Sequence, residues 1–547
     1  MSHNLTTVKR RRNMDSTIFN PQEEFETKYR DLHLENTRAF FNDLVEKSGV
    51  DIELNRETVR KYNEYKNNLE KLNKSLFWWR FLRVLMCITL ILIPLVVIKV
   101  TPKIRGMREE IANAEQNAER LLQDAYDQMA PLNALFTDRD ALNIIEKTLP
   151  RISFDTKLSP EQETDMKINY DFFDEDEYEQ STLGVLAGKY NENPFLFENR
   201  FVHTMGTETY HGELTITWTE TYVSNGKVYT RTRRETLHAS VEKPKPYYST
   251  QVVLNYCTQG GPELIFTRSA AHHERMSDKE TEKFVKKFEK QLKKMENKAL
   301  KNGGDFTALA NTEFEALFDA TDRNNELQYR TLFTPLAQTN MVKLMRKTTG
   351  YGDDFSFFKI NRTNVIVTEH SQGRVLNVMP EAYYSYNYDE INDNFTNKNI
   401  TFFKDVYFDF APVWAIPMYQ DRPVHSLKPI PSMERYYSRK ESEALTNLVD
   451  YSYVVHPNTK TDAIVKSTFV ASHDKVDETL VTAYSYDIYD RVDYVQVYGG
   501  DGHYHSVPVP WKEYIPLQQQ TTLFVSDAET AQEKNVIATR NGMCIFN

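Results

Sequence analysis

Cysteine is scarce in this sequence: the 547 residues contain three, Cys87, Cys257 and Cys544. They fit no metal-ligand spacing and no disulfide framework, so two free thiols are the default, with one bridge between Cys257 and Cys544 as the alternative. An excess of positive charge is also lacking: acidic residues outnumber lysine and arginine, and the net charge is −11. Because phosphate recognition requires a basic face, this balance argues against a nucleic-acid partner.

Motifs of catalysis are lacking as well. No serine or cysteine lies in a nucleophile-elbow motif, and the glycine-rich loop at 499–502 lacks the lysine and the strand–loop–helix context of a phosphate loop. His503 and His505 lie on one face of a predicted strand and form a candidate metal pair, but no carboxylate or cysteine at a recognisable spacing completes it. The sequence therefore favours a non-enzymatic protein without a cofactor. A membrane-tethered hydrolase or metal-dependent enzyme using residues 490–510 is the alternative.

One long apolar stretch is present, at residues 76–100. No residue from Val84 to Ile98 is charged. A membrane-spanning helix needs about 20 apolar residues, and Phe77–Val100 reaches that length if the charged groups at both ends extend toward the lipid headgroups. We therefore predict one transmembrane helix and a lipid bilayer as partner; a buried helix of a soluble core is the alternative. The predicted anchor residues are Trp78, Trp79, Arg80, Arg83, Pro94 and Lys99.

Apolar residues at heptad spacing flank this stretch on both sides. Before it they are Tyr62, Tyr65, Leu69, Leu72 and Leu76, and after it Ile104, Met107, Ile111, Ala114, Ala118, Leu121 and Ala125. The pattern predicts a helical region at 21–75 and a helical stalk at 101–150, separated by the bilayer. Two interpretations stay open: a homo-oligomer through the stalk, or packing of these helices within one chain.

The charges around the apolar stretch leave its orientation open. Five basic residues precede it from Lys66 on, and four follow it up to Arg108. This difference is too small for the positive-inside rule to select an orientation. Residues 1–20 are predicted to be a disordered basic tail, with Lys9–Arg12 in place of a cleavable signal peptide. These features favour a single-pass protein of the cell membrane with an extracytoplasmic globular part. A cytoplasmic globular part is the alternative.

The clearest local signal is a β-hairpin around Asn225-Gly226, the preferred dipeptide of a two-residue type I′ turn. This turn pairs residues whose numbers add up to 451, for example Leu214 with Leu237 and Thr215 with Thr236. Opposite charges, aromatic pairs and threonine pairs then face each other across the strands. We expect the face that carries Trp218 to point inward and the threonine face to point to solvent.

The whole chain is predicted to be an α+β protein: N-terminal helices with one transmembrane helix and heptad-like stalk segments, then a β-rich C-terminal globular region. A capping box of Ser277 and Glu280 predicts a long helix at 278–301. A strand is expected at Thr401–Phe410. The remaining segments are an acidic linker at 151–200, an α+β domain at 201–430 and a β-rich subdomain at 431–547.

Residues 311–370 carry a resemblance to a known family. The runs Glu313–Asp322, Glu326–Pro335 and Met341–Met345 join a phenylalanine-rich start, an acidic turn and a leucine-threonine-proline helix entry, followed by a strand pair. This arrangement resembles a family of bacterial membrane-anchored proteins of unknown function. The resemblance implies an anchor and a helix ahead of a β-rich part, but no chemistry. Together these features favour a membrane-anchored scaffold or interaction protein.

Overall fold

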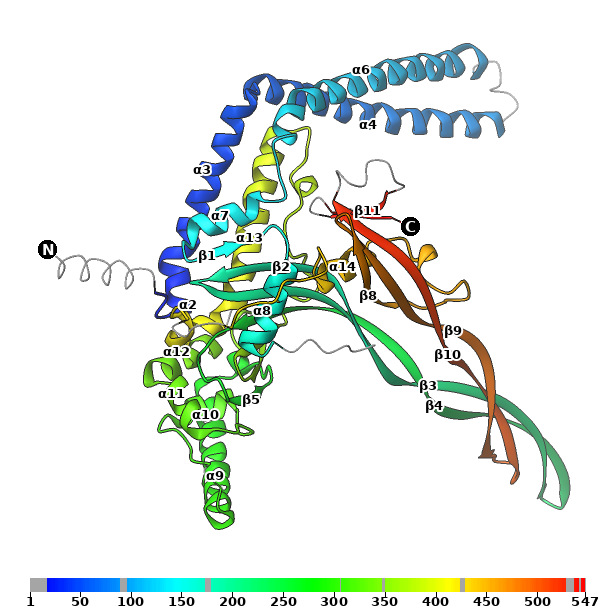
Figure 1. Ribbon diagram of the computed structural model, residues 1–547. Helices are drawn as coiled ribbons and strands as arrows, with labels where there is room; N and C mark the ends of the chain where they lie inside the picture. The colour runs from blue at the N-terminus through cyan, green and yellow to red at the C-terminus, as the bar shows by residue number, and fades with distance from the viewer. Residues whose placement is uncertain are drawn as a thin grey trace. The chain divides into compact units, whose positions relative to one another are not determined.

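The protein is described by a computed structural model. The described residues are 17–88, 96–172, 179–304, 306–346, 350–423, 428–527, 536–540 and 543–546. The chain divides into two compact units: unit 1 consists of Met1–Pro21, Arg151–Leu376 and Phe408–Asn547, and unit 2 of Gln22–Pro150 and Asn377–Tyr407. The fold is α+β, with helices at the N-terminal end and a β-rich C-terminal region, as the sequence predicts (Figure 1).

Unit 2 is helical. Its elements are α2 (Pro21–Glu24), η1 (Phe25–Tyr29), α3 (Arg30–Ser48), α4 (Ile52–Ile88), η3 (Val96–Val100), α6 (Thr101–Asn133), α7 (Asp140–Thr148), η5 (Pro380–Ala382) and the first part of α13 (Tyr388–Trp414). The core lies between α3 and α13, where the ring of His33 stacks on Phe403 with centroids 3.9 Å apart. Burial lowers the pKa of His33 to about 3, so this imidazole is neutral.

Helices α4 and α6 form an antiparallel hairpin (Figure 1). The apolar residues of one helix pack on those of the other along the heptad positions. This cluster contains Leu69, Leu72, Leu76, Trp79 and Met86 of α4 together with Val96, Val100, Ile104, Met107 and Ile111 of η3 and α6. At the other end, Gln128 of α6 donates a hydrogen bond to Thr58 of α4. Of the two interpretations of the heptad pattern, packing within one chain is therefore observed.

This hairpin corrects the prediction of one straight transmembrane helix at 76–100. Residues 20 positions apart on a straight helix lie about 30 Å from each other, yet Leu76 and Val96 belong to the same apolar cluster. Helix α6 therefore does not continue the axis of α4, and the two heptad segments lie side by side. Among the described residues, no helix is both long and apolar enough to cross a bilayer. Residues 89–95, Pro94 included, lie outside the described part.

Unit 1 contains two antiparallel sheets. The seven-stranded sheet has the order β1-β2-β3-β4-β7-β6-β5 and the five-stranded sheet the order β11-β12-β10-β9-β8. The first is built from β1 (Ile152–Phe154), β2 (Gln180–Tyr190), β3 (Asn193–Ser224), β4 (Lys227–Cys257), β5 (Ile265–Arg268), β6 (Phe355–Ile360) and β7 (Thr363–Thr368). The second is built from β8 (Ile464–His473), β9 (Val476–Tyr498), β10 (Tyr504–Asp527), β11 (Val536–Arg540) and β12 (Met543–Phe546).

The predicted register of the β3–β4 hairpin is confirmed. Asn225 and Gly226 both have positive φ, 51° and 74°, as a type I′ turn requires. Residues whose numbers add up to 451 pair from Ser224 and Lys227 at the turn to Phe195 and Tyr256 at the base. The threonine face is exposed, and Trp218 on the other face is half-buried. The turn therefore sets the pairing along the whole hairpin.

The β9–β10 hairpin packs on the inner face of β3–β4. Ile216 and Leu237 of one hairpin form an apolar cluster with Val507 of the other. At Gly212 the two backbones approach so closely that an added Cβ would overlap the carbonyl of Pro508. Lys243 pairs with Asp493 at 2.6 Å beside this crossing. The two hairpins thus form one double-layered arm.

Unit 1 also contains helices. They are α8 (Pro160–Tyr170), η4 (His273–Arg275), α9 (Asp278–Asn302), α10 (Thr312–Phe318), α11 (Glu326–Leu332), α12 (Pro335–Met345), η6 (Pro417–Gln420), α14 (Arg439–Thr446) and η7 (Tyr451–Tyr453). Helix α9 begins with the predicted capping box of Ser277 and Glu280, and Phe288 and Leu292 bury its apolar seam. The strand pair expected after the Thr334 cap of α12 is present as β6 and β7.

Two predictions of secondary structure are wrong. Residues 401–410, expected to be a strand, belong to α13. Their aromatic content favours a strand. Phe403, Tyr407 and Phe410, however, are spaced four and three residues apart, and this helical spacing buries them on one face of α13. The acidic stretch 151–200 is not a linker, because its described residues form β1, α8, β2 and the start of β3. Burial of Val185, Leu196 and Met166 in one cluster explains this.

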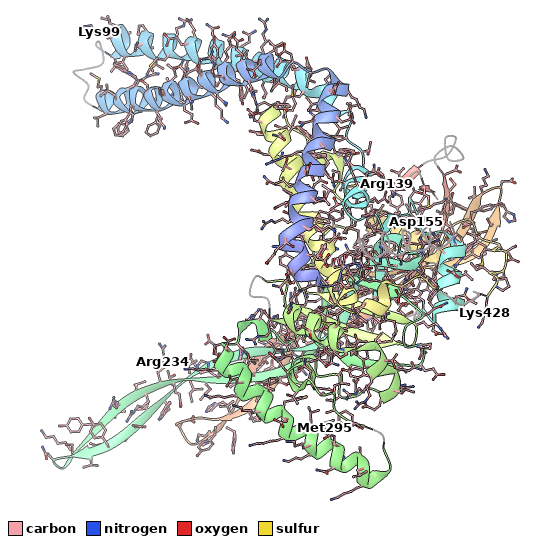
Figure 2. The ribbon with its side chains drawn as sticks, turned by 90° about the vertical axis from the view of Figure 1, so that its left-hand side faces the viewer. Lys99, Arg139, Asp155, Arg234, Met295 and Lys428 are labelled. Atoms are coloured by element: carbon pink, nitrogen blue, oxygen red, sulfur yellow. The ribbon has the colours of Figure 1, made fainter. Side chains whose placement is uncertain are left out.

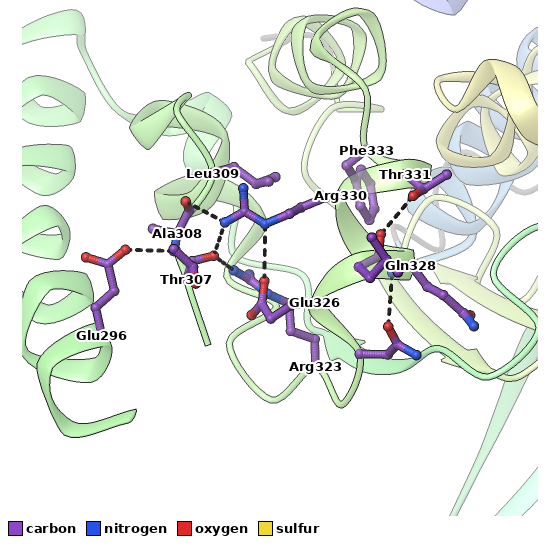
Figure 3. A network of polar contacts seen from close by, with 12 residues as sticks. Glu296, Thr307, Ala308, Leu309, Arg323, Glu326, Gln328, Arg330, Thr331 and Phe333 are labelled. Carbon is purple, nitrogen blue, oxygen red and sulfur yellow. Dashed lines mark hydrogen bonds and ion pairs between the residues drawn. The ribbon is translucent and has the colours of Figure 1, made fainter. Parts of the chain in front are cut away.

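In the segment with the family resemblance, the buried side chain of Arg323 joins residues of neighbouring elements by ion pairs (Figure 3). Arg323 pairs with Glu315 at 2.9 Å and with Glu326 at 2.8 Å, and all three side chains are at most 9% exposed. Its guanidinium also lies over the ring of Tyr329, 4.1 Å from the centroid. The phenylalanine-rich start and the acidic turn are therefore held to α11 by ion pairs, in addition to packing.

Replacing Arg323 by methionine should destabilise the protein strongly. Two buried carboxylates would lose their partner, which costs about 3–5 kcal/mol. Urea unfolding at equilibrium measures this change. The matched control is Lys293→Met, which removes an exposed pair with Glu289 on α9 and should cost less than about 1 kcal/mol. Equal losses in the two variants would contradict a special role of the buried network.

Candidate functional site

The end of the α4–α6 hairpin exposes an unusual number of large apolar side chains. Trp78 is 65% exposed and Ile98 is 71% exposed. We define the hairpin end as Phe77–Met86 and Val96–Lys99; its exposed apolar residues are Phe77, Trp78, Phe81, Leu82, Val84, Leu85, Val97 and Ile98. Contiguous apolar patches of this kind mark surfaces that contact a partner or a membrane.

The heptad packing explains why this patch is exposed. Trp79 and Met86 turn toward η3 and α6 and join the apolar cluster of the hairpin. Phe77, Trp78 and Phe81 lie away from this seam and are 64%, 65% and 52% exposed. There Trp78 stands between Phe77 and Phe81, with ring centroids 6.0 and 5.9 Å apart. The packed face holds the helix in place while the aromatic face points outward.

Basic residues surround the exposed apolar surface. Between Glu70 and Glu109 the sequence has eight lysines and arginines and no acidic residue, although the whole chain carries a net charge of −11. All eight are exposed: Lys71, Lys74, Arg80, Arg83, Lys99, Lys103, Arg105 and Arg108. Figure 2 labels Lys99 at the far end of the hairpin. An apolar surface bordered by cations matches the chemistry of an anionic bilayer interface.

The structure brings most of the predicted anchor residues together, but in a different arrangement. Trp78, Arg80 and Arg83 are exposed on α4, and Lys99 is exposed on η3. Trp79 is partly buried in the seam between the helices. Pro94 lies outside the described residues. The predicted residues therefore contribute to one end of a hairpin, where the sequence analysis had placed them along a single helix.

The histidines proposed as a metal pair have ordinary partners. His505 lies 3.0 Å from Asp501, and the backbone N–H of His503 donates to the same carboxylate. The hydrogen bond with His505 lowers the pKa of Asp501. In the part of the chain that the structure describes, no group of three or more His, Cys, Asp or Glu side chains is placed to hold a metal ion. No observation favours the enzyme that residues 490–510 suggested.

A buried ionic network in unit 1 was missed by sequence reasoning. His370 lies 2.6 Å from Asp354 and 3.3 Å from Asp409, and Arg374 pairs with Asp409 at 2.7 Å. These residues lie next to the ends of β6 and β7, in the following loop and in α13, so no local sequence motif predicts the network. Ser371 donates to Asp409 and is fully buried, so it is not an accessible nucleophile.

The network fixes the charge of its histidine. Burial by itself lowers the pKa of His370, but the hydrogen bonds and charges of Asp354 and Asp409 outweigh burial and raise it to about 9. Burial likewise favours neutral Asp409, but Arg374 and His370 lower the pKa of this carboxyl to about 2. The His370 imidazolium and the Asp409 carboxylate are therefore charged together at neutral pH, which suits a structural brace between β7 and α13.

The stability of the protein should therefore fall at alkaline pH. The folded pKa of His370 is above the unfolded value of 6.5, so its contribution is complete below pH 6.5 and is lost as the pH rises through 9. The shift corresponds to about 3 kcal/mol. Urea unfolding at pH 6 and above pH 9 should show this loss in the wild type and not in His370→Gln. His211→Gln, at an exposed position of β3, is the control; a loss unchanged in His370→Gln would refute the assignment.

Comparison with known proteins adds no identity. No family model, curated protein or solved structure matches the chain. The protein has an α+β fold with a helical hairpin whose end is apolar, aromatic and basic. The family resemblance of residues 311–370 stays a hypothesis.

Proposed function

We propose that this chain is a membrane-anchored, non-enzymatic scaffold or interaction protein, held to lipid by the end of the α4–α6 hairpin. The observation that carries the proposal is the exposed aromatic and aliphatic surface at the hairpin end, together with eight cations and no acidic residue around it. Such a surface would be costly to keep in water, and burial of each large side chain in an apolar medium gains about 1.5–3 kcal/mol.

The mode of attachment is interfacial. Trp78 and Phe81 enter the region between headgroups and acyl chains, while Arg80 and Arg83 stay at headgroup level and contact anionic lipid. Each basic group near an anionic surface contributes about 1 kcal/mol. Because α4 and α6 are antiparallel, both arms of the hairpin stay on the same side of the bilayer. The extracytoplasmic position predicted for the globular part assumed a membrane span, so it does not follow from an interfacial anchor. Protease protection in intact cells measures on which side of the membrane unit 1 lies.

The double-layered arm of unit 1 supplies the interaction part of the proposal. Near the tips of its two hairpins the aromatic rings of Tyr222, Tyr229, Tyr498 and Tyr504 are each at least 45% exposed. Tyrosines of this kind give large contact areas at low cost in side-chain entropy and are enriched in protein interfaces. A scaffold needs such a surface separate from its anchor, and these residues belong to a different unit from the hairpin end.

Vesicle flotation with the full-length protein tests the anchor. The wild type should float with vesicles that contain anionic lipid, and the double variant Trp78→Glu/Phe81→Glu should bind at least about tenfold more weakly, because two apolar groups are replaced by charges that the lipid repels. Arg80→Gln/Arg83→Gln should weaken binding to anionic vesicles and leave binding to neutral vesicles nearly unchanged.

The matched control is Leu300→Glu/Leu327→Glu. These two leucines are 81% and 76% exposed on helices α9 and α11 of unit 1, so the variant makes the same kind of change away from the hairpin. It should float like the wild type. Absence of wild-type flotation, or equal weakening in both double variants, would overturn the proposal. Loss of a dimer in sedimentation, without any effect on lipid binding, would instead assign the hairpin end to self-association.

A further inference from the structure

Helix α9 of unit 1 carries a face of lysines that the anchor proposal does not use (Figure 1). Six of these lysines follow one another at steps of three and four residues, so they lie on one side of the helix. We call them the lysine stripe: Lys283, Lys287, Lys290, Lys294, Lys298 and Lys301. All six are exposed. The stripe is about 27 Å long, because each helical residue adds about 1.5 Å.

The opposite face of α9 is buried, which fixes the direction of the stripe. Phe288 and Leu292 pack in an apolar cluster with Ala316 of α10. The carboxylate of Glu296 accepts a hydrogen bond from the backbone N–H of Ala308 at 2.8 Å. A rotation of α9 that brought its lysines toward the rest of the unit would break these contacts. The stripe therefore faces solvent.

Beyond the capping box, the acidic residues of α9 do not neutralise the stripe. Glu282 pairs with Lys286 at 3.7 Å and Glu289 pairs with Lys293 at 2.8 Å, and both of these lysines lie beside the stripe. Side chains on a helix meet when they are three or four residues apart. Neither Glu282, Glu289 nor Glu296 has this spacing from a lysine of the stripe. Positive charge thus accumulates on one face of a chain whose net charge is −11.

The stripe lowers the stability of its own helix. Like charges three or four residues apart destabilise a helix, and each lysine of the stripe has such a neighbour, as Lys290 has in Lys287 and Lys294. A glutamate in place of Lys290 would turn these repulsions into attractions without touching the buried face. Proteins keep arrangements that cost stability mainly where function needs them. This cost indicates that the stripe serves binding.

Among polyanions, an acidic polypeptide fits the stripe best. A helix that lies on a bilayer buries its apolar face in lipid, but the apolar face of α9 is already packed within unit 1. A nucleic acid carries dense negative charge along its whole length, which the acidic remainder of this chain would repel. A short run of carboxylates meets neither obstacle. Eight extended residues of such a run span about 27 Å, which matches the length of the stripe.

We propose that the lysine stripe binds a run of aspartate and glutamate residues in a partner protein. The ion pairs form at the surface, so salt weakens them. Complementary charge of this kind speeds association and selects the partner. The stripe belongs to unit 1 and the hairpin end to unit 2, so this inference holds whether or not the hairpin binds lipid.

Fluorescence anisotropy with the full-length protein tests this site with labelled octaglutamate as the probe. Octaglutamate should bind in about 50 mM NaCl and at least about tenfold more weakly in about 300 mM NaCl, because salt screens exposed charges. Labelled octaglutamine, which has the same length and no charge, should not bind. No binding of octaglutamate, equal binding of octaglutamine, or tighter binding of the single-stranded RNA octauridylate would overturn the proposal.

The double variant Lys290→Glu/Lys298→Glu separates binding from folding. It should bind octaglutamate at least about tenfold more weakly, while its melting temperature is no lower than that of the wild type, because repulsive pairs of the stripe become attractive. The matched control is Lys189→Glu/Lys227→Glu, which makes the same change of charge at two exposed lysines of β2 and β4. Equal affinities of Lys290→Glu/Lys298→Glu and the wild type, or equal losses in both variants, would refute the site.

Vesicle flotation shows whether the stripe binds lipid instead. Lys290→Glu/Lys298→Glu should float like the wild type, because α9 has no free apolar face to bury. A loss of flotation as large as that of Trp78→Glu/Phe81→Glu would assign the stripe to lipid and overturn the proposal. Absence of wild-type flotation contradicts the anchor alone, since octaglutamate binding is measured without vesicles.

Discussion

The packing of two apolar seams in the α4–α6 hairpin is the constraint on which the exposed apolar surface of the hairpin end depends. Each helix presents apolar residues at heptad spacing, and the hairpin satisfies both seams at once, as in the cluster of Leu76, Val100 and Ile104. Because the seam faces are used up, other apolar residues of the same stretch, such as Trp78 and Val97, stay exposed, at 65% and 61%. One sequence pattern thus produces both a buried interface and an exposed apolar surface: Trp79 packs against the buried cluster, and Trp78 is exposed.

Sequence reasoning succeeded where the structure is decided locally. The Asn225-Gly226 turn fixed the register of the longest hairpin, since only one pairing follows from a two-residue turn. The capping boxes and the Thr334-Pro335 entry likewise marked where helices begin, because caps act through hydrogen bonds within four residues. At these places the chain has little freedom to choose another structure.

It failed where long-range packing decides. An apolar run has the same sequence pattern whether it crosses lipid or packs along another helix, so residues 76–100 gave no sign that Val96 lies in one apolar cluster with Leu76. The aromatic residues around Phe403 favour a strand by their composition, but they form a helix in the structure because helical spacing buries them on one face. The ion pairs of His370 and of Glu198 join residues from distant parts of the chain, such as Asp409 and Lys440, and no spacing in the sequence reveals them.

The close approach of Gly212 and Pro508 has a mechanical consequence. A lone two-stranded hairpin is only marginally stable in water, because nothing packs on its faces. Here two ribbons from different sheets touch backbone to backbone, and the pair of Lys243 and Asp493 clamps them beside that point. A side chain larger than hydrogen at position 212 would wedge them apart. The two hairpins therefore support each other at this point, and the contact ties the β3–β4 hairpin of the seven-stranded sheet to the β9–β10 hairpin of the five-stranded sheet.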